Sequence, residues 1–447
     1  MPSTETTSAA RASELPRVLS LWDATMLVVS SVIGVGIFFT PGGVAHLLPN
    51  ATWFFAAWAA GGLLALAGAL ANAELGAMFP RAGGNYVYLR AAYHPMAGFL
   101  VGWLSFFASF AGTVATLAVG FAVSLSSFVE LGKFGKIAVA VGVIWLTSGV
   151  NLYATRAGAK LNTLTGYLKV AALIVLVVAG PLIGHSRAAA TPLQSAGPAT
   201  LSNFGVALSP VIFSYLGWNA SVYVAGEIEA PEKNLPRSLF VGLAICTAIY
   251  VLVTGVFVYA LGMSGLAAGK TVGFEAGQVL FGAKGSLVVT GIMLVSVFGC
   301  LNSNVLIGPR IAYAMAKDGL FLRIAARLSK RQTPWIAIVV QGVTATVLVV
   351  AFEDLESVLD YTTFAIVLAT IADTVALYVL RAREPSRPRP YRAAGYPVVP
   401  ALYILANIAV GALMVRARPI ECLTSIAILV AGVLVYLLFA RNVPKSA

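Results

Sequence analysis

Long runs without a charged residue divide the chain, and they cover 24–73, 91–129, 137–155, 188–226, 238–269, 285–309, 332–352, 393–415 and 422–440. A single membrane crossing needs about 20 residues, so the longer runs must hold two helices or one interrupted helix. The pattern predicts an all-α membrane protein with twelve transmembrane helices, over 18–47 (with a break), 52–78, 94–125, 136–153, 162–183, 201–228 (with a break), 238–262, 278–316, 334–351, 356–381, 398–416 and 420–440.

The first predicted helix contains residues that do not favour a helix. Within SSVIGVGIFFTPGG (30–43), Gly34, Gly36 and Pro41 interrupt an apolar run, although glycine costs about 1 kcal/mol and proline about 3 kcal/mol relative to alanine in a helix. The ten residues from Ala24 to Ile33 reach about 15 Å, half of the roughly 30 Å hydrocarbon core. We therefore expect this helix to be broken near the membrane midplane.

The sixth predicted helix repeats this plan. FGVALSPVIF (204–213) is followed by SYLGWN (214–219), which contains Gly217, after Pro210 has weakened the helix. Two interrupted helices in matching positions of two five-helix halves with opposite topology indicate a secondary transporter with an inverted repeat. The alternative is that these glycines only permit close packing or a kink, which is common in membrane helices.

Interrupted helices expose backbone groups that can bind a ligand. The free N–H groups at the start of a half-helix hold an anion such as a carboxylate, and freed carbonyl groups accept hydrogen bonds from a cation. Such backbone survives at this depth only where protein or a wet cavity satisfies it. Donors and acceptors a few ångströms apart suit the zwitterionic head of an amino acid.

The charge distribution adds an orientation. Hydrophobic residues make up 59% of the chain and charged residues only 10%, against roughly 25% charged in soluble domains. About three quarters of the 29 Lys and Arg residues fall on the side of the predicted loops that holds both termini, and the positive-inside rule places that side in the cytosol. We expect a multi-pass protein of the cell (inner) membrane. The same bias explains the net charge of +12, so nucleic acid is not a predicted partner.

No constellation typical of an enzyme or a metal centre is present. Cys246, Cys300 and Cys422 lie in apolar segments, which favours packed thiols over a disulfide framework. The three histidines have no metal-ligand spacing to a cysteine or carboxylate. The sequence predicts no metal, no cofactor and no enzymatic activity.

Several stretches, spread in order over nearly the whole chain, resemble the amino acid-polyamine-organocation (APC) superfamily of transporters, most closely its L-type amino acid transporter branch. They are SSVIGVGIFFTPGGVA (30–45), AELGAMFPRAGGNYVYLRAAY (73–93), FSYLGWNASVYVAGEIEAPEKNLPRSL (213–239), FGCLNSN (298–304) with RIAYAMAKDG (310–319), and RPYRAAGYPVVP (389–400). The resemblance implies a 5+5 inverted repeat with discontinuous helices 1 and 6, followed by helices 11 and 12. The domain boundaries we expect are a tail at 1–17, one transporter domain at 18–440 (18–183, 201–381 and 398–440) and a tail at 441–447.

The resemblance also implies how a small amino acid substrate binds. Its carboxylate would accept hydrogen bonds from backbone N–H groups, and its amino group would donate to backbone carbonyls. The implied donors are Val35, Gly36 and Ile37, and the implied acceptors are Ser31 or Val32 on the first helix and Phe213 and Leu216 on the sixth. Ser214 and Gly217 belong to the same break and are counted with this site.

Phe213 is implied to be an outer gate whose ring lies over the substrate, although packing against lipid or core is the ordinary role of a membrane phenylalanine. The sequence departs from the family in several places. Val35 stands where many relatives have serine, and Leu216 where some have glycine. The segment 126–136 lacks the cysteine by which mammalian heterodimeric members attach a second subunit, so no disulfide-linked ancillary subunit is expected.

Two ionisable residues lie within predicted spans, Lys169 and Asp373. A charge at this depth is usually functional, or else it reaches the interface, and the residues alone leave both readings open for Lys169. The resemblance favours a coupling role, because relatives carry a lysine where sodium-coupled relatives bind the ion. Asp373 fits either a proton site or a structural role. Secondary candidates near the inferred cavity are Tyr215, Trp218, Asn219, Asn302 and Ser303.

Glu74, Glu227 and Glu229 fall near cytosolic helix ends beside Arg81, Lys233 and Arg237, where a solvated or gate-forming cluster of ion pairs is expected. The predicted function is sodium-independent secondary transport of neutral L-amino acids by alternating access, as an exchanger or a proton-coupled symporter. The alternatives are a polyamine or cationic amino acid antiporter, for which no acid is seen near the breaks, and a channel or sensor.

Overall fold

The chain folds into helices. The computed structural model describes residues 15–186, 200–269, 271–352 and 355–440. Within them every named element is helical, and an isolated parallel bridge joins Leu19 to Ile228. Ten of the described helices are long and apolar enough to cross a membrane, and the bent pair α2 (Leu21–Val32) and α3 (Gly36–Leu47) makes an eleventh span. The all-α, multi-pass membrane fold is therefore confirmed.

The other helices follow in chain order. They are α4 (Ala51–Met78), α5 (Asn85–Ala92), α6 (Pro95–Leu104), the π-helix η1 (Ser105–Phe110), α7 (Ala111–Leu125), α8 (Lys133–Tyr153), α9 (Thr155–Ile183), α10 (Leu201–Tyr215), α11 (Ala220–Tyr223), the 3-10 helix η3 (Ala225–Glu227), α12 (Pro231–Ala268), α13 (Val272–Ile307), α14 (Pro309–Lys317), the 3-10 helix η4 (Arg323–Ala326), α15 (Trp335–Phe352), α16 (Leu355–Arg383), α17 (Val398–Ala417) and α18 (Pro419–Ala440).

The first helix is broken where the glycines predict it. α2 begins with a capping box, in which Ser20 Oγ accepts from the Asp23 N–H (3.2 Å) and Asp23 Oδ2 accepts from the Ser20 N–H (3.1 Å). It ends at Val32, and after residues 33–35 the chain resumes as α3 at an angle of 46°. Pro41 lies inside α3 without ending it.

The second break lies at 216–219, and the residues after it differ from the expectation. α10 runs through Pro210 and ends at Tyr215. Gly217 adopts φ +97°, a backbone conformation that residues with a side chain rarely adopt. The expected second half-helix to 228 is wrong, because only the four-residue α11 and the 3-10 turn η3 follow. α10 is too short to count as a span by itself, so the twelfth span and the inverted repeat stay predictions.

Some helix starts were predicted too late. α9 begins at 155 instead of 162, α12 at 231 instead of 238, and α13 at 272 instead of 278. Polar residues at these ends led to the late predictions, but extending an existing helix into the polar region is inexpensive, and Pro231 is favoured in a first turn. Most of the predicted tails, at 1–14 and 441–447, lies outside the described residues.

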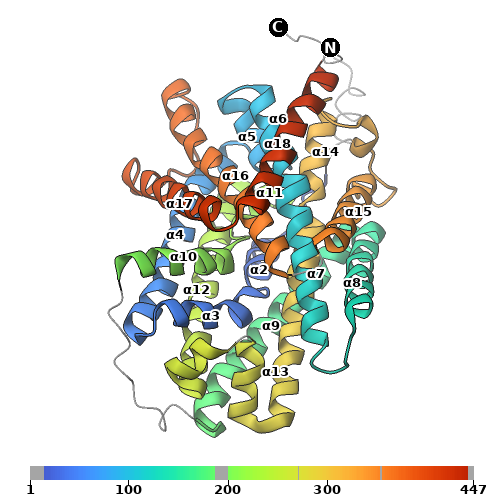
Figure 1. Cartoon of the computed structure of the whole chain (residues 1–447). Coiled ribbons are helices and arrows are strands. Elements are labelled where there is room, and N and C mark those ends of the chain that lie inside the picture. The colour runs from blue at the N-terminus through green and yellow to red at the C-terminus, as the bar shows by residue number, and fades with distance from the viewer. Residues whose placement is uncertain (1–14, 187–199, 270, 353–354, 441–447) are drawn as a thin grey trace, which may run out of the picture.

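The two broken segments lie beside each other. In Figure 1, α3 (blue) and α10 (green) run next to one another, although they belong to different halves of the chain, and they contact each other. α2 packs against α9, α12 and α13, and residues of α7 and α16 also lie around the breaks. The breaks are thereby enclosed by long helices.

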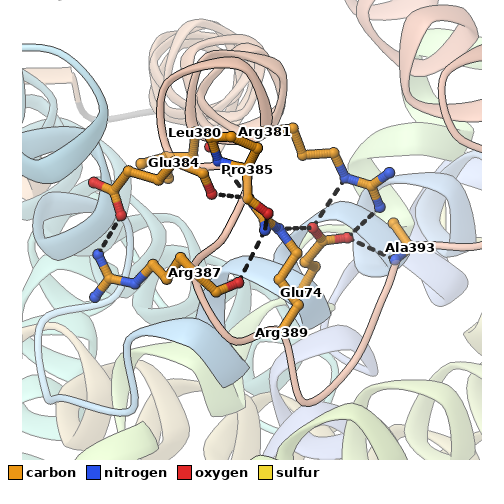
Figure 2. A network of polar contacts seen from close by, with 8 residues as sticks. All are labelled: Glu74, Leu380, Arg381, Glu384, Pro385, Arg387, Arg389 and Ala393. Atoms are coloured by element: carbon orange, nitrogen blue, oxygen red, sulfur yellow. Dashed lines mark hydrogen bonds and ion pairs between the residues drawn. The ribbon is translucent and has the colours of Figure 1, made fainter.

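Buried ion pairs anchor the ends of these helices. The Glu74 carboxylate on α4 accepts from Arg381 Nε (3.0 Å) and from the Ala393 N–H (2.7 Å), and it forms an ion pair with Arg389 (3.2 Å), as Figure 2 shows. Glu227 pairs with Arg310 at 2.8 Å, and both side chains are buried. The expected solvated cluster with neighbours in the sequence is wrong for both glutamates, because their partners come from distant parts of the chain.

Candidate substrate-binding site

An internal cavity of about 80 Å³ lies at the two breaks. Its walls come from the α2–α3 break, the end of α10 with the turn after it, η1 and α7, α13, and α16. The predicted site residues that line it are Ser31, Val32, Val35, Gly36, Phe213, Ser214, Leu216, Gly217 and the secondary candidate Asn219. Ile37 is buried but does not line it. The structure therefore brings together residues from both breaks.

The start of α3 presents free donors. Among the described residues, the N–H groups from Gly34 to Ile37 have no backbone acceptor, and Phe38 is the first to donate, to Val35 O at 3.1 Å. Such groups carry the positive end of the helix dipole. Val35 and Gly36 lie on the cavity wall, so their amides are available to an anion there.

The carbonyl groups at the end of α2 are already engaged by side chains. Lys169 Nζ donates to Ile33 O (2.8 Å) and Ser30 O (3.3 Å), and the Cys300 thiol donates to Ser31 O (3.1 Å). Tyr250 Oη donates to Val32 O (2.7 Å). A carbonyl oxygen has two lone pairs, so the predicted acceptors Ser31 and Val32 retain capacity for a ligand.

Tyr250 on α12 joins the two breaks, because its hydroxyl also lies 2.8 Å from Ser214 O at the end of α10. The residue is fully buried, and its ring packs edge-on against Trp58 and Tyr215. The prediction from sequence missed it. The only available signal was a tyrosine in the middle of an apolar span, because a buried hydroxyl needs a partner.

Glycine allows the breaks to touch. A Cβ atom on Gly36 would lie 2.8 Å from the Ser214 Cα atom, and one on Gly217 would lie 2.7 Å from Ser31 O. Thr40 Oγ1 and Ser214 Oγ are 2.9 Å apart and add a bond between α3 and α10. Both glycines are thus required by close approach of backbone, and Gly217 also by its positive φ.

The remaining walls carry small hydroxyl groups that the sequence prediction did not name. Ser105 and Ser109 come from η1, Thr113 and Thr116 from α7, and Thr362 and Thr370 from α16. Ser109 Oγ is buried and has no partner among the described residues. A π-helix such as η1 often marks a functional site. These walls face the backbone of the breaks and could contact a substrate side chain.

Lys169 is fully buried and does not reach the interface. Besides its two bonds to α2, Nζ donates to Ser296 O on α13 (2.9 Å). All three protons of the ammonium thus have carbonyl acceptors, and the charge lies at the negative end of the α2 dipole. Lys169 does not line the cavity, so it contacts the break on the side that faces away from the cavity.

Most secondary candidates do not line the cavity. Tyr215 donates to Trp58 O at 3.1 Å, and Trp218 packs against Tyr403. Asn302 accepts from Asn151 and donates to Gly158 O, which ties α13 to α8 and α9. Ser303 Oγ lies 2.5 Å from Ser31 Oγ and so supports a lining residue. Asp373 is buried outside the lining.

Two broken helices meeting at a cavity define a class of protein, the membrane transporters built on discontinuous helices. A sequence model of the family described as "Amino acid permease" matches residues 19–446. The chain belongs to this amino acid permease family, within the APC superfamily and close to its L-type branch, and it is therefore an amino acid transporter and not an enzyme.

Individual relatives agree with this assignment. The chain is 31% identical to the serine/threonine exchanger SteT of Bacillus subtilis, over 94% of this chain and 96% of that protein. It is 26% identical to the human b(0,+)-type amino acid transporter 1, over 96% and 89%. It is also 26% identical to the mouse large neutral amino acids transporter small subunit 2, over 99% and 85%.

Proposed function

We propose that the chain transports small neutral L-amino acids by alternating access, without sodium, as an exchanger or a proton-coupled symporter. The observation that carries the proposal is the cavity in which the free N–H groups of Val35 and Gly36 face a wall of small hydroxyl groups. The similarity to a serine/threonine exchanger supports a small substrate that carries a hydroxyl group.

In the proposed complex, the substrate carboxylate accepts hydrogen bonds at the start of α3, from Val35, Gly36 and Ile37. Its amino group donates to carbonyls at Ser31 or Val32 and at Phe213 or Leu216. Phe213 lines the cavity and is proposed to close over the substrate as a gate. Ser109, whose hydroxyl lacks a partner among the described residues, is proposed to bind the substrate hydroxyl.

Sodium independence is proposed from Lys169. In transporters with broken helices, the carbonyl groups at the end of a half-helix often coordinate a coupling cation. Here the ammonium of Lys169 binds Ser30 O, Ile33 O and Ser296 O. A protein cation therefore already occupies the carbonyl groups that would otherwise be available to a metal ion.

A polyamine or cationic amino acid is the second candidate, but the described residues that line the cavity include no carboxylate. A cationic side chain would be left there without a counter-charge.

We also propose that both termini are cytosolic, that the membrane is the cell (inner) membrane, and that nucleic acid is not a partner. The buried position of Cys246, Cys300 and Cys422 supports function without a disulfide-linked subunit.

Counterflow in proteoliposomes tests the proposal. Liposomes preloaded with serine are exposed to radiolabelled serine, threonine, alanine, leucine, arginine or putrescine, in sodium or in choline medium. We expect exchange of the small neutral amino acids at the same rate in both media. Preference for arginine or putrescine would favour the second candidate, sodium-dependent exchange would contradict the role of Lys169, and flux far above transporter rates would indicate a channel.

Ser109→Ala should reduce the preference for serine over alanine about five-fold, the effect of losing about 1 kcal/mol.

A further inference from the structure

Asp373 on α16 is a buried acid that the substrate site does not use. Its exposed fraction is 0%, and among the described residues neither of its carboxyl oxygens has a hydrogen-bond partner. The ion pairs of the described residues do not include it, and Arg381, two turns further along the same helix, is held by Glu74. Asp373 therefore has no counter-charge in this conformation.

The groups around Asp373 are polar but uncharged. The Asn85 side chain on α5 lies near the carboxyl group, although it forms no hydrogen bond with either oxygen. Among the described residues, the ionisable side chains that interact electrostatically with it are Tyr88 on α5, Tyr93 just after α5, Tyr223 on α11 and Tyr403 on α17. Tyr88 already donates to Asn72 Oδ1 at 2.6 Å, and Tyr93 to Ala372 O at 3.2 Å.

Asp373 lies next to the substrate cavity. Thr370, one helical turn earlier on α16, lines that cavity, and so do Tyr223 and Ser105. Asn85, which interacts with Asp373, donates to Ser105 Oγ at 2.9 Å. A short polar path therefore leads from the cavity wall to the carboxyl group.

On the other side of Asp373, α5 separates it from a second, larger cavity. This cavity of about 1010 Å³ is lined by Val87, Arg90 and Ala91 on α5, together with residues of α14. Asn85 and Tyr88 on the same helix interact with Asp373. The eight-residue α5 is thus the partition between the acid and this cavity, which lies on the predicted cytosolic side.

An ionised carboxylate without a counter-charge is strongly unfavourable in a buried site, even with one neutral amide nearby, whereas the neutral acid is tolerated. We propose that Asp373 is a proton-binding site coupled to substrate movement, which is loaded while α5 covers it and discharges into the larger cavity when α5 moves. In the discharge step the carboxyl O–H bond breaks, the proton passes to water, and the carboxylate remains, solvated. This inference rests on the proposed function and selects its proton-coupled form.

Proton movement in proteoliposomes tests the coupling. A pH-sensitive dye in the lumen is followed while serine enters, with the wild type, Asp373→Asn and Asp373→Glu. The matched control is Asp360→Asn, the same substitution on the same helix at a carboxylate that pairs with Arg418 (3.0 Å). We expect serine-dependent proton movement in the wild type, the control and Asp373→Glu, and a fall to background in Asp373→Asn, which still performs serine counterflow.

Wild-type protein that exchanges serine without proton movement would overturn the inference, and so would an Asp373→Asn variant that moves protons like the wild type. Infrared spectroscopy of the purified protein gives a readout that needs no transport. The C=O band of a protonated carboxylic acid should be present in the wild type, shifted in Asp373→Glu and lost in Asp373→Asn. Absence of that band from the wild type would overturn the inference even if the substrate proposal failed, and failed counterflow with the band present would overturn only the proposed function.

Discussion

The Tyr250 hydroxyl offers a direct test of how the two breaks are held together. Replacing Tyr250 with phenylalanine keeps the ring and its contacts with Trp58 and Tyr215 but removes the donor that bonds Val32 O at 2.7 Å and reaches Ser214 O at 2.8 Å. The ring still fills its space, so no cavity contributes to the effect.

The size of the effect follows from these two contacts. A protein hydrogen bond contributes about 0.5–1.5 kcal/mol net, and measured values in membrane proteins average about 0.6 kcal/mol with a maximum of about 1.7 kcal/mol. The hydroxyl has one proton, which the two carbonyl groups share, so the loss corresponds to about one hydrogen bond, or about 0.5–1.5 kcal/mol. If that free energy holds the breaks in their binding geometry, Tyr250→Phe should raise the KM for substrate about 2- to 13-fold.

The assay is the KM of counterflow in proteoliposomes, together with the thermal unfolding temperature in detergent. Tyr259→Phe is the matched control, because it is the same substitution on the same helix at a half-exposed tyrosine. We expect the control to match the wild type. A Tyr250→Phe protein whose KM and unfolding temperature both equal those of the wild type would refute the reasoning that this hydroxyl connects the breaks.

Further predictions concern the glycines, the buried ammonium and the buried ion pairs. Gly36→Ala should abolish counterflow while Gly43→Ala does not, because a Cβ atom at 43 meets no atom within 4 Å; equal activities would contradict the close approach of the breaks. Lys169→Met should reduce the transport rate at least tenfold while monodisperse protein is retained, as judged by size-exclusion chromatography, and a normal rate would exclude the coupling role. Glu74→Gln should lower the free energy of unfolding by about 3–5 kcal/mol, since it breaks a buried ion pair. Glu384→Gln, at a half-exposed pair, should change it by about 0–1 kcal/mol. Denaturant unfolding in detergent distinguishes these values, and similar losses in the two variants would contradict the anchoring role of the buried pair.

The sequence predicted those features that depend on local composition. Hydrophobic runs gave the positions of most helices, and Gly34, Gly36 and Gly217 gave both breaks, because glycine and proline in an apolar helix are costly and therefore informative. The second break was less well described beyond 219, since the backbone there is set by contacts with other helices. No local signal distinguishes a half-helix from a short turn at that point.

The features that the sequence did not predict depend on long-range contacts. Glu74 pairs with Arg381 and Arg389, more than three hundred residues away along the chain, so nearest neighbours in the sequence were the wrong guide. The role of Tyr250 depends on three helices meeting at one point. The serine and threonine residues of η1 and α7 have the sequence pattern of small residues that pack in any membrane helix. Only the position of the cavity identifies them as lining residues.

The close approach of Gly36 and Gly217 to the opposite break has a consequence for how substrate preference can change. No larger side chain fits at these contacts, so the part of the site that we propose to bind the amino and carboxylate groups of the substrate is closed to variation. Thr113, Ile366 and Ala369 line the cavity from α7 and α16 and are not glycines held against the backbone of a break. Substitutions at these positions, in evolution or in the laboratory, can therefore change which substrate side chain fits, while the proposed binding of the amino and carboxylate groups is kept.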